Sequence, residues 1–216
     1  MPFVSAEALL STLAPATGLD DPPVEPTGEV SGRALRDWRL AVTRALGPDA
    51  VAQVRAESGL DPQTLPDDPT AGSWLPVGHQ LRLTRAALRL SGDSLAALPQ
   101  LLVAPALGVV GRVKRKLLKL TLPPAVLLAR ADRIHAELYR PGLAAASPVT
   151  TTHGNAGPVR EAQISWQGGP FHADPTWRAL QIVAIAGFFA AIDTPLTLAD
   201  ATGPEAPSFA LALRWS

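Results

Sequence analysis

The spacing of apolar residues changes at Gly142, and this change limits the possible folds more than any other feature of the sequence. Before Gly142, apolar side chains recur every three or four residues, which is the period of a helix that buries one face. After it, they alternate with polar residues over 159–167 and 209–215, which is the period of a half-buried strand. A helical half followed by an antiparallel sheet predicts the α+β class.

In the first half we expect helices over residues 32–46, 49–58, 74–90 and 124–140, separated by Gly and Pro residues that stop each one. The second half predicts the order strand, strand, helix, strand, strand. Its parts are a hairpin that turns at Gly154–Gly157, a helix that Asp174 caps, a strand over Leu196–Ala201 and a last strand over Phe209–Trp215.

The most apolar stretch of the sequence is Ala179–Ile192, which only Gln181 interrupts. It runs for 14 residues, whereas a membrane-spanning helix needs about 20. We therefore expect a buried helix there. The last strand should pack against it through the apolar side chains that share one face, which are Phe209, Leu211, Leu213 and Trp215.

Residues 1–30 differ from the rest because they hold five acidic residues, no basic residue and several prolines. They predict an acidic, proline-rich N-terminal arm, followed by a single α+β ligand- or partner-binding domain over 31–216. The first residues lack the positive charge that a secretory signal carries, so a cytoplasmic location is expected. The absence of cysteine excludes disulfides and thiolate metal sites.

A basic helix is predicted over residues 108–120, within which 111–120 carry the charge. Its cations share a face about 100° wide by helical geometry, and that face could meet nucleic acid, an anionic membrane or an acidic protein. A plain solvated face is the other interpretation. Opposite charges predict that the N-terminal arm masks this helix. The residues on the face are Arg112, Arg115, Lys116 and Lys119.

Catalytic and metal-binding patterns are missing from the sequence. Ser165 lacks the flanking glycines of a nucleophile elbow. The histidines are scattered without paired carboxylates: His79 is expected on an exposed helix face, His153 beside a turn, and His172 next to a helix cap. We therefore expect a protein that is not an enzyme, with no metal centre and no cofactor.

Three stretches carry a resemblance to a known family. They are the sequence WLPV at 74–77 with Gly92 after it, the helix from Pro123 that ends in YRPG at 139–142, and Phe171–Trp177 together with a last strand that ends in LRW. In this order and spacing the chain resembles a myxobacterial family of proteins of similar length.

That family is remotely similar to a superfamily that includes heme-based nitric-oxide/oxygen sensors, 4-vinyl-reductase-like domains and TRAPP trafficking subunits. The chain lacks the cysteines of the last two groups. The heme sensors place a His on a helix and a Tyr/Ser/Arg trio around the heme. His135 is predicted on a helix, with Tyr139 and Arg140 nearby as a possible ligand pocket, although the trio's spacing is not reproduced.

The resemblance implies a non-enzymatic binding or assembly module. We expect it to engage a protein partner, a second copy of itself in a homo-oligomer, or a small apolar ligand between the helices and the sheet. One alternative is a nucleic-acid- or membrane-associated protein that uses the basic helix. A second alternative is a small-molecule or heme sensor domain.

Overall fold

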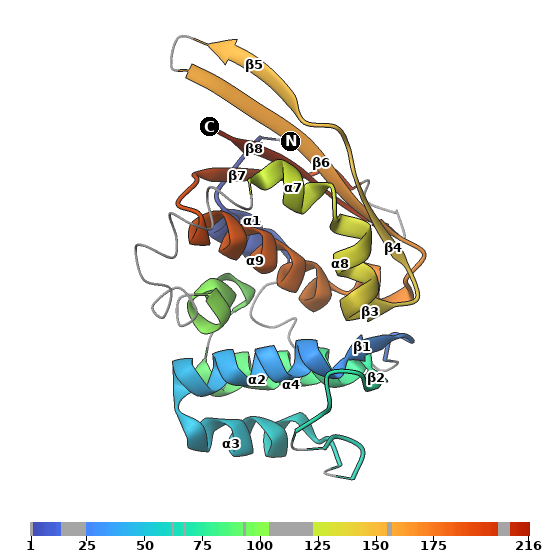
Figure 1. The fold of residues 1–216 in the computed structure, drawn as a ribbon. Coiled ribbons are helices and arrows are strands. Elements are labelled where there is room, and N and C mark those ends of the chain that lie inside the picture. The colour runs from blue at the N-terminus through green and yellow to red at the C-terminus, as the bar shows by residue number, and fades with distance from the viewer. Residues whose placement is uncertain are drawn as a thin grey trace.

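The computed structural model describes residues 2–13, 25–61, 63–66, 68–92, 94–103, 123–154, 157–202 and 208–216. Within these ranges the chain has the predicted α+β fold. An antiparallel sheet from the C-terminal half lies on one side, and helices from the N-terminal half lie on the other, with the long helix α9 between them (Figure 1).

The larger sheet has the strand order β4-β6-β8-β7, and β5 pairs with the part of β6 that β4 leaves open. The hairpin and the last two strands are those that the sequence predicts, whereas β4 is an addition. The strands are β4 (Leu143–Ala146), β5 (Thr150–Gly154), β6 (Gly157–Gln167), β7 (Leu196–Asp200) and β8 (Phe209–Trp215).

The inner face of β8 is buried as predicted: Phe209, Leu211 and Leu213 are fully covered, and Trp215 almost so. Each lies against α9 or the neighbouring strands, and the Trp215 ring centre is 5.5 Å from that of Phe189 on α9. Alternate residues of β8 therefore build the floor of the core.

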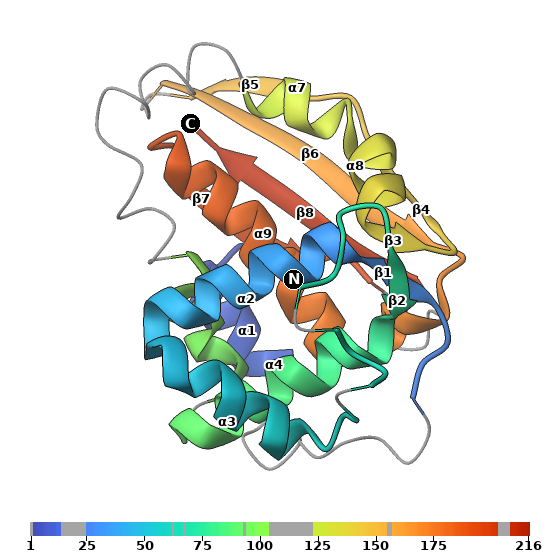
Figure 2. The same cartoon turned by 60° about the horizontal axis from the view of Figure 1, so that its bottom comes forward.

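Helix α9 (Pro175–Ala191) begins where the sequence predicts. The Asp174 carboxylate accepts hydrogen bonds from the backbone N–H groups of Thr176 and Trp177, and Pro175 takes the first helical position. The helix is apolar on nearly every side because it packs on the sheet with one face and on N-terminal helices with others. These helices are α1 (Ala6–Leu13), α4 (Val77–Ser91) and η3 (Pro99–Val103). Figure 2 shows it crossing the molecule between these layers.

The predicted helix over 124–140 is two helices, α7 (Pro124–Leu128) and α8 (Ala131–Leu138), with a break at Ala129 and Arg130. The prediction of one continuous helix was therefore wrong. Tyr139 and Arg140 belong to a short strand, β3, instead of the helix. The break lets α7 and α8 lie against the sheet, next to α9 (Figure 1).

The N-terminal helices pack as an antiparallel group below α9. The Ser31 hydroxyl accepts from the Ala34 N–H and so caps α2, whose buried face includes Leu35, Trp38 and Val42, as predicted. The predicted helix from Trp74 begins three residues later, because 74–76 form a strand. The elements are α2 (Gly32–Leu46), α3 (Pro48–Ser58), α4 (Val77–Ser91), η2 (Leu95–Ala97) and η3 (Pro99–Val103).

A second, three-stranded sheet joins the start of α2 to the end of α8. Its strand order is β2-β1-β3, with β1 (Glu29–Ser31) in the centre, β2 (Trp74–Pro76) on one side and β3 (Tyr139–Arg140) on the other. These strands are too short to show a period of two in the sequence, so sequence reasoning missed them. They fix Tyr139 next to the N-terminal helices.

The described parts of the predicted N-terminal arm pack on the domain. Helix α1 (Ala6–Leu13) buries Leu9 and Leu10, and Val4 pairs with Leu198 of β7. The predicted basic helix, with Arg112, Arg115, Lys116 and Lys119, lies outside the described residues. Among the described residues, no helix is both long enough and apolar enough to cross a membrane.

Candidate functional site

A cavity of about 190 Å³ lies between α7, α8, strand β6 and helix α9. Aliphatic and aromatic side chains make nearly all of its wall, and the polar groups in it belong to His135, Tyr139, Gln181 and the indole of Trp166. The lining residues are Leu127, Leu128, Ala131, Ile134, His135, Leu138, Tyr139, Ile164, Trp166, Gln181, Ala184, Ile185 and Phe188.

The break between α7 and α8 places His135 in the cavity wall. Helix α8 turns its buried face, with Ala131 and His135, toward the sheet and α9. The His135 side chain is 3% exposed. Four aromatic rings surround it, with ring centres between 5.5 and 6.4 Å from its own, and these belong to Tyr139, Phe171, His172 and Trp177.

Both ring nitrogens of His135 are buried and have no hydrogen-bond partner among the described residues. Burial disfavours the charged imidazolium, and it lowers the pKa of His135 from 6.5 to about 4. The ring is therefore neutral at pH 7. A neutral imidazole has one N–H donor and one acceptor nitrogen. In His135, neither of these groups makes a hydrogen bond to another described residue.

His172 lies beside His135 on the short helix η4 (Pro170–Ala173), and it is fully buried. The Gly169 N–H donates to its Nδ1 at 3.3 Å, so the proton of the neutral ring is on Nε2. Burial lowers the pKa of His172 to about 4, and repulsion from the Arg178 guanidinium, and from His135 once that ring is protonated, lowers it further. Gly142, at φ +124°, passes close to the ring, where a Cβ would meet Cε1 at 3.0 Å.

Tyr139 is a second polar residue at the cavity, and its hydroxyl is hydrogen-bonded. It donates to Oε1 of Gln80 on α4 at 3.1 Å, and the side chain of Gln181 on α9 lies beside it. Burial raises the pKa of Tyr139 to about 12, so the phenol keeps its proton. Tyr139 thereby links α4, β3 and α9 at one corner of the cavity.

Arg140 follows Tyr139 along the chain but lies away from the cavity. It is exposed, its Nε is 2.6 Å from Oε2 of Glu29, and its guanidinium stacks 3.9 Å above the Trp74 ring. Of the three residues predicted to form a ligand pocket, the structure brings His135 and Tyr139 together at the cavity, and it places Arg140 on the outer surface.

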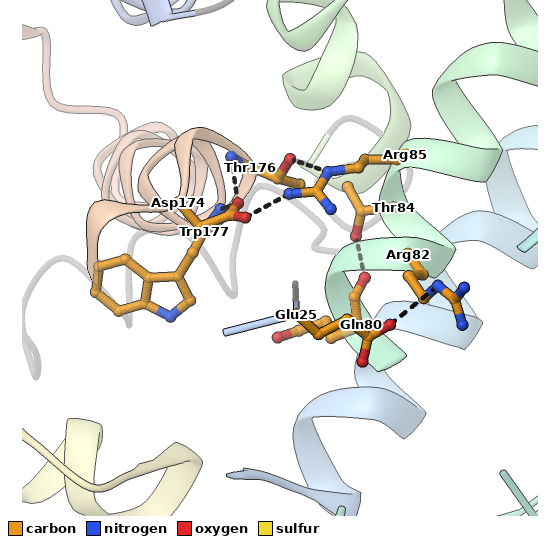
Figure 3. Close-up of polar contacts among 8 residues, drawn as sticks. All are labelled: Glu25, Gln80, Arg82, Thr84, Arg85, Asp174, Thr176 and Trp177. Atoms are coloured by element: carbon orange, nitrogen blue, oxygen red, sulfur yellow. Dashed lines mark hydrogen bonds and ion pairs between the residues drawn. The ribbon is translucent and has the colours of Figure 1, made fainter. Parts of the chain in front are cut away.

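A buried ion pair joins α4 to the start of α9, which forms one wall of the cavity. Arg85 of α4 donates to the Asp174 carboxylate and, through Nε, to the Thr176 hydroxyl at 3.0 Å. The Arg85 and Asp174 side chains are 4% and 8% exposed. Figure 3 shows Arg85 reaching from α4 to the start of α9, one turn from Trp177. This contact fixes α9, and with it the cavity wall, against the N-terminal helices.

Sequence reasoning missed several residues of the site. The sequence places His172 only beside a helix cap, whereas in the structure it is fully buried next to His135. His79, which was expected on an exposed helix face, is also buried. The available signal was Gln181, the one polar residue in a long apolar run. A lone amide in such a run predicts a polar neighbour, and here Gln181 lies beside Tyr139 at the cavity.

No protein-family model and no curated protein matches the sequence. Solved structures do resemble the fold. An H-NOX variant from T. tengcongensis matches with a TM-score of 0.54 at 12% identity, over 86% of this chain and 96% of that one. An oxygen-binding H-NOX domain related to soluble guanylate cyclases matches with a TM-score of 0.52 at 13% identity, over 86% and 94%. The chain therefore shares the H-NOX fold, an α+β architecture.

The residues at the cavity do not fit a heme. Pockets for drug-sized ligands span roughly 300–1,000 Å³, and a porphyrin is larger than most such ligands, whereas this cavity measures about 190 Å³. No arginine lines the cavity among the described residues.

Proposed function

We propose that the chain is a ligand-binding domain of the sensor type, which holds one small apolar molecule in the cavity between α7, α8, β6 and α9. The observation that carries the proposal is the cavity itself, a hollow that opens to the surface and whose wall is almost wholly apolar, as in most small-molecule sites. The H-NOX fold of the chain supports this choice over a catalytic role, since one matching structure is described as an oxygen-binding H-NOX domain related to soluble guanylate cyclases.

The size of the cavity sets the size of the ligand. An apolar cavity of about 150 Å³ stays dry and accepts benzene. At about 190 Å³, the cavity of this chain has room for one ring with a small substituent. Its walls of Ile134, Ile164, Trp166 and Phe188 suit such a ring through dispersion and aromatic contacts.

Calorimetric titration with toluene tests this proposal. We expect saturable binding by the natural chain, and loss of binding in Ala131→Leu, because the added side chain fills the cavity from α8. Ala136→Leu is the matched control, since Ala136 is on the exposed face of the same helix, and it should bind toluene like the natural chain. Absence of toluene binding in the natural chain, or equal binding by both variants, would overturn the proposal.

A hemin titration separates the apolar ligand from a porphyrin. We expect no Soret band that depends on His135, because the cavity is too small and, among the described residues, no arginine lines it. A saturable Soret band that His135→Leu abolishes would favour a heme sensor instead.

A further inference from the structure

A second hollow, of about 230 Å³, adjoins the cavity on the side of the N-terminal helices, where it lies between α2, η3 and α9. This position agrees with Figure 1, in which α9 lies between α8 and α2. The cavity and the second hollow have a common border, because both are lined by Leu138, Tyr139, Gln181 and Ala184. The two are therefore neighbouring compartments that share α9 as a wall.

A stripe of α9 forms the floor that runs from one compartment to the other. Its residues Gln181, Ala184 and Phe188 are three and four positions apart, so they share one face of the helix. Ala184 is exposed and the other two are half-buried, whereas all the leucine, isoleucine and valine residues of α9 are buried. An exposed apolar stripe on an otherwise buried helix is typical of a groove that binds a ligand.

The wall of the second hollow is apolar where it faces this stripe. Helix α2 contributes Ala34 and Ala41, and η3 adds two aliphatic side chains. The buried amide in the wall, Gln80, already accepts the hydrogen bond of the Tyr139 hydroxyl. Among the described residues, the only charged side chain in the wall is that of Asp37, which is exposed at the rim. The second hollow therefore suits an aliphatic group.

The size of the two compartments sets the shape of a molecule that fills both. The cavity has room for one ring, and Trp166 and Phe188 offer that ring aromatic contacts. A ligand confined to the cavity leaves the second hollow without an occupant. A chain that continues across the border buries more apolar surface, and each buried methylene group strengthens binding by about threefold.

We infer that the cavity and the second hollow form one elongated site for a molecule with a ring at one end and a flexible aliphatic chain at the other. The ring lies in the cavity, and the chain crosses the border beside Ala184 into the second hollow. The border residues divide the site, so a flexible chain suits it better than a rigid plate such as a porphyrin. This inference rests on the proposed function, because it adds a second compartment to the same site.

A series of phenylalkanols tests the inference, because its members carry the same ring and hydroxyl group and differ only in chain length. Benzyl alcohol, 4-phenylbutan-1-ol and 6-phenylhexan-1-ol are titrated by calorimetry into the natural chain. We expect saturable binding of one molecule per chain, with an affinity that rises by about threefold for each added methylene group.

Variants in the second hollow separate specific binding from general hydrophobicity. Ala34→Leu and Ala41→Leu each place a larger side chain in the second hollow, and neither residue lines the cavity. Both variants should bind benzyl alcohol like the natural chain and bind 6-phenylhexan-1-ol at least tenfold more weakly. Ala34 is half-buried whereas Ala41 is 8% exposed, so Ala34→Leu provides the test if Ala41→Leu does not fold.

The matched control is Ala45→Leu, since Ala45 is exposed on the same helix and lines neither compartment. It should keep the gain with chain length. An affinity that does not rise from benzyl alcohol to 6-phenylhexan-1-ol, or a rise that persists in Ala34→Leu, would overturn the inference and leave the apolar site standing. Failure of toluene to bind would overturn the proposed function itself.

Discussion

The imidazole rings of His135 and His172 meet edge to face, with 5.5 Å between their centres, although one comes from α8 and the other from the turn before α9. Both are buried and both have a pKa lowered to about 4. Protonation of either ring places a charge beside the other in an apolar surrounding. The pair therefore makes the core sensitive to acid.

We predict that the free energy of unfolding falls between pH 7 and pH 5. In the unfolded chain a histidine has a pKa near 6.5, so it binds a proton in this window while the folded form does not. The stability is complete above pH 6.5 and is lost as the pH falls toward 4, by about 2 kcal/mol per histidine at pH 5. Urea denaturation at the two pH values measures it, and His135→Leu should remove part of the loss, because His172 and the buried His79, whose pKa is also lowered, remain. A natural chain equally stable at both values would contradict this.

The chain has a single tyrosine, so its ultraviolet titration reports Tyr139 alone. The pKa of Tyr139 is raised to about 12 by burial. We predict that the folded protein shows little phenolate absorbance at pH 10.5, whereas the protein in urea at that pH shows most of it, since an unfolded tyrosine titrates near pH 10. Equal absorbance in the two states would show that the hydroxyl is open to solvent.

The buried Arg85–Asp174 ion pair should dominate the polar contribution to stability. Asn retains the capping function of Asp174, so Asp174→Asn removes the buried charge that the Arg85 guanidinium contacts and keeps the cap. We predict a loss of about 3 kcal/mol in the free energy of unfolding. Glu161→Gln breaks the exposed pair with Arg214 and should cost less than about 1 kcal/mol. Similar losses for both variants, measured by urea denaturation, would disagree with this account.

The last strand should be essential to the core. Leu213 is fully buried on β8, whereas Leu143 on β4 is 53% exposed. We predict that Leu213→Ala lowers the free energy of unfolding by about 2–5 kcal/mol, and that Leu143→Ala changes it by less than about 0.5 kcal/mol. A chain that ends at Ser208 loses all of β8 and should not unfold cooperatively. A cooperative transition in that chain would contradict the prediction.

The elements that the sequence predicts well are those with a long, regular pattern. The alternation over β6 and β8 and the cap at Asp174 identify the sheet and α9 to within a few residues. The strands β1, β2 and β3 span three residues or fewer, so they carry no period and exist only because long-range pairing joins them. The break between α7 and α8 likewise has no proline or glycine to mark it.

For a similar reason, only part of the candidate site could be predicted from the sequence. His135 and Tyr139 are four residues apart, so helical arithmetic places them together. Their partners Gln80, His172 and Gln181 come from α4, η4 and α9, and only tertiary packing brings these together. The sequence shows that Gln181 interrupts an apolar run, but it does not show which group that amide meets.

A crystal structure of the protein grown with bromobenzene tests the central claim, that the cavity between α8, β6 and α9 holds a small apolar molecule. Bromine scatters anomalously, so its position is found without reference to the rest of the ligand. We predict one strong anomalous peak inside the wall formed by Ile134, Ile164 and Phe188, and its absence in Ala131→Leu. Crystals that show no peak there, or a peak only on the outer surface, would contradict the account.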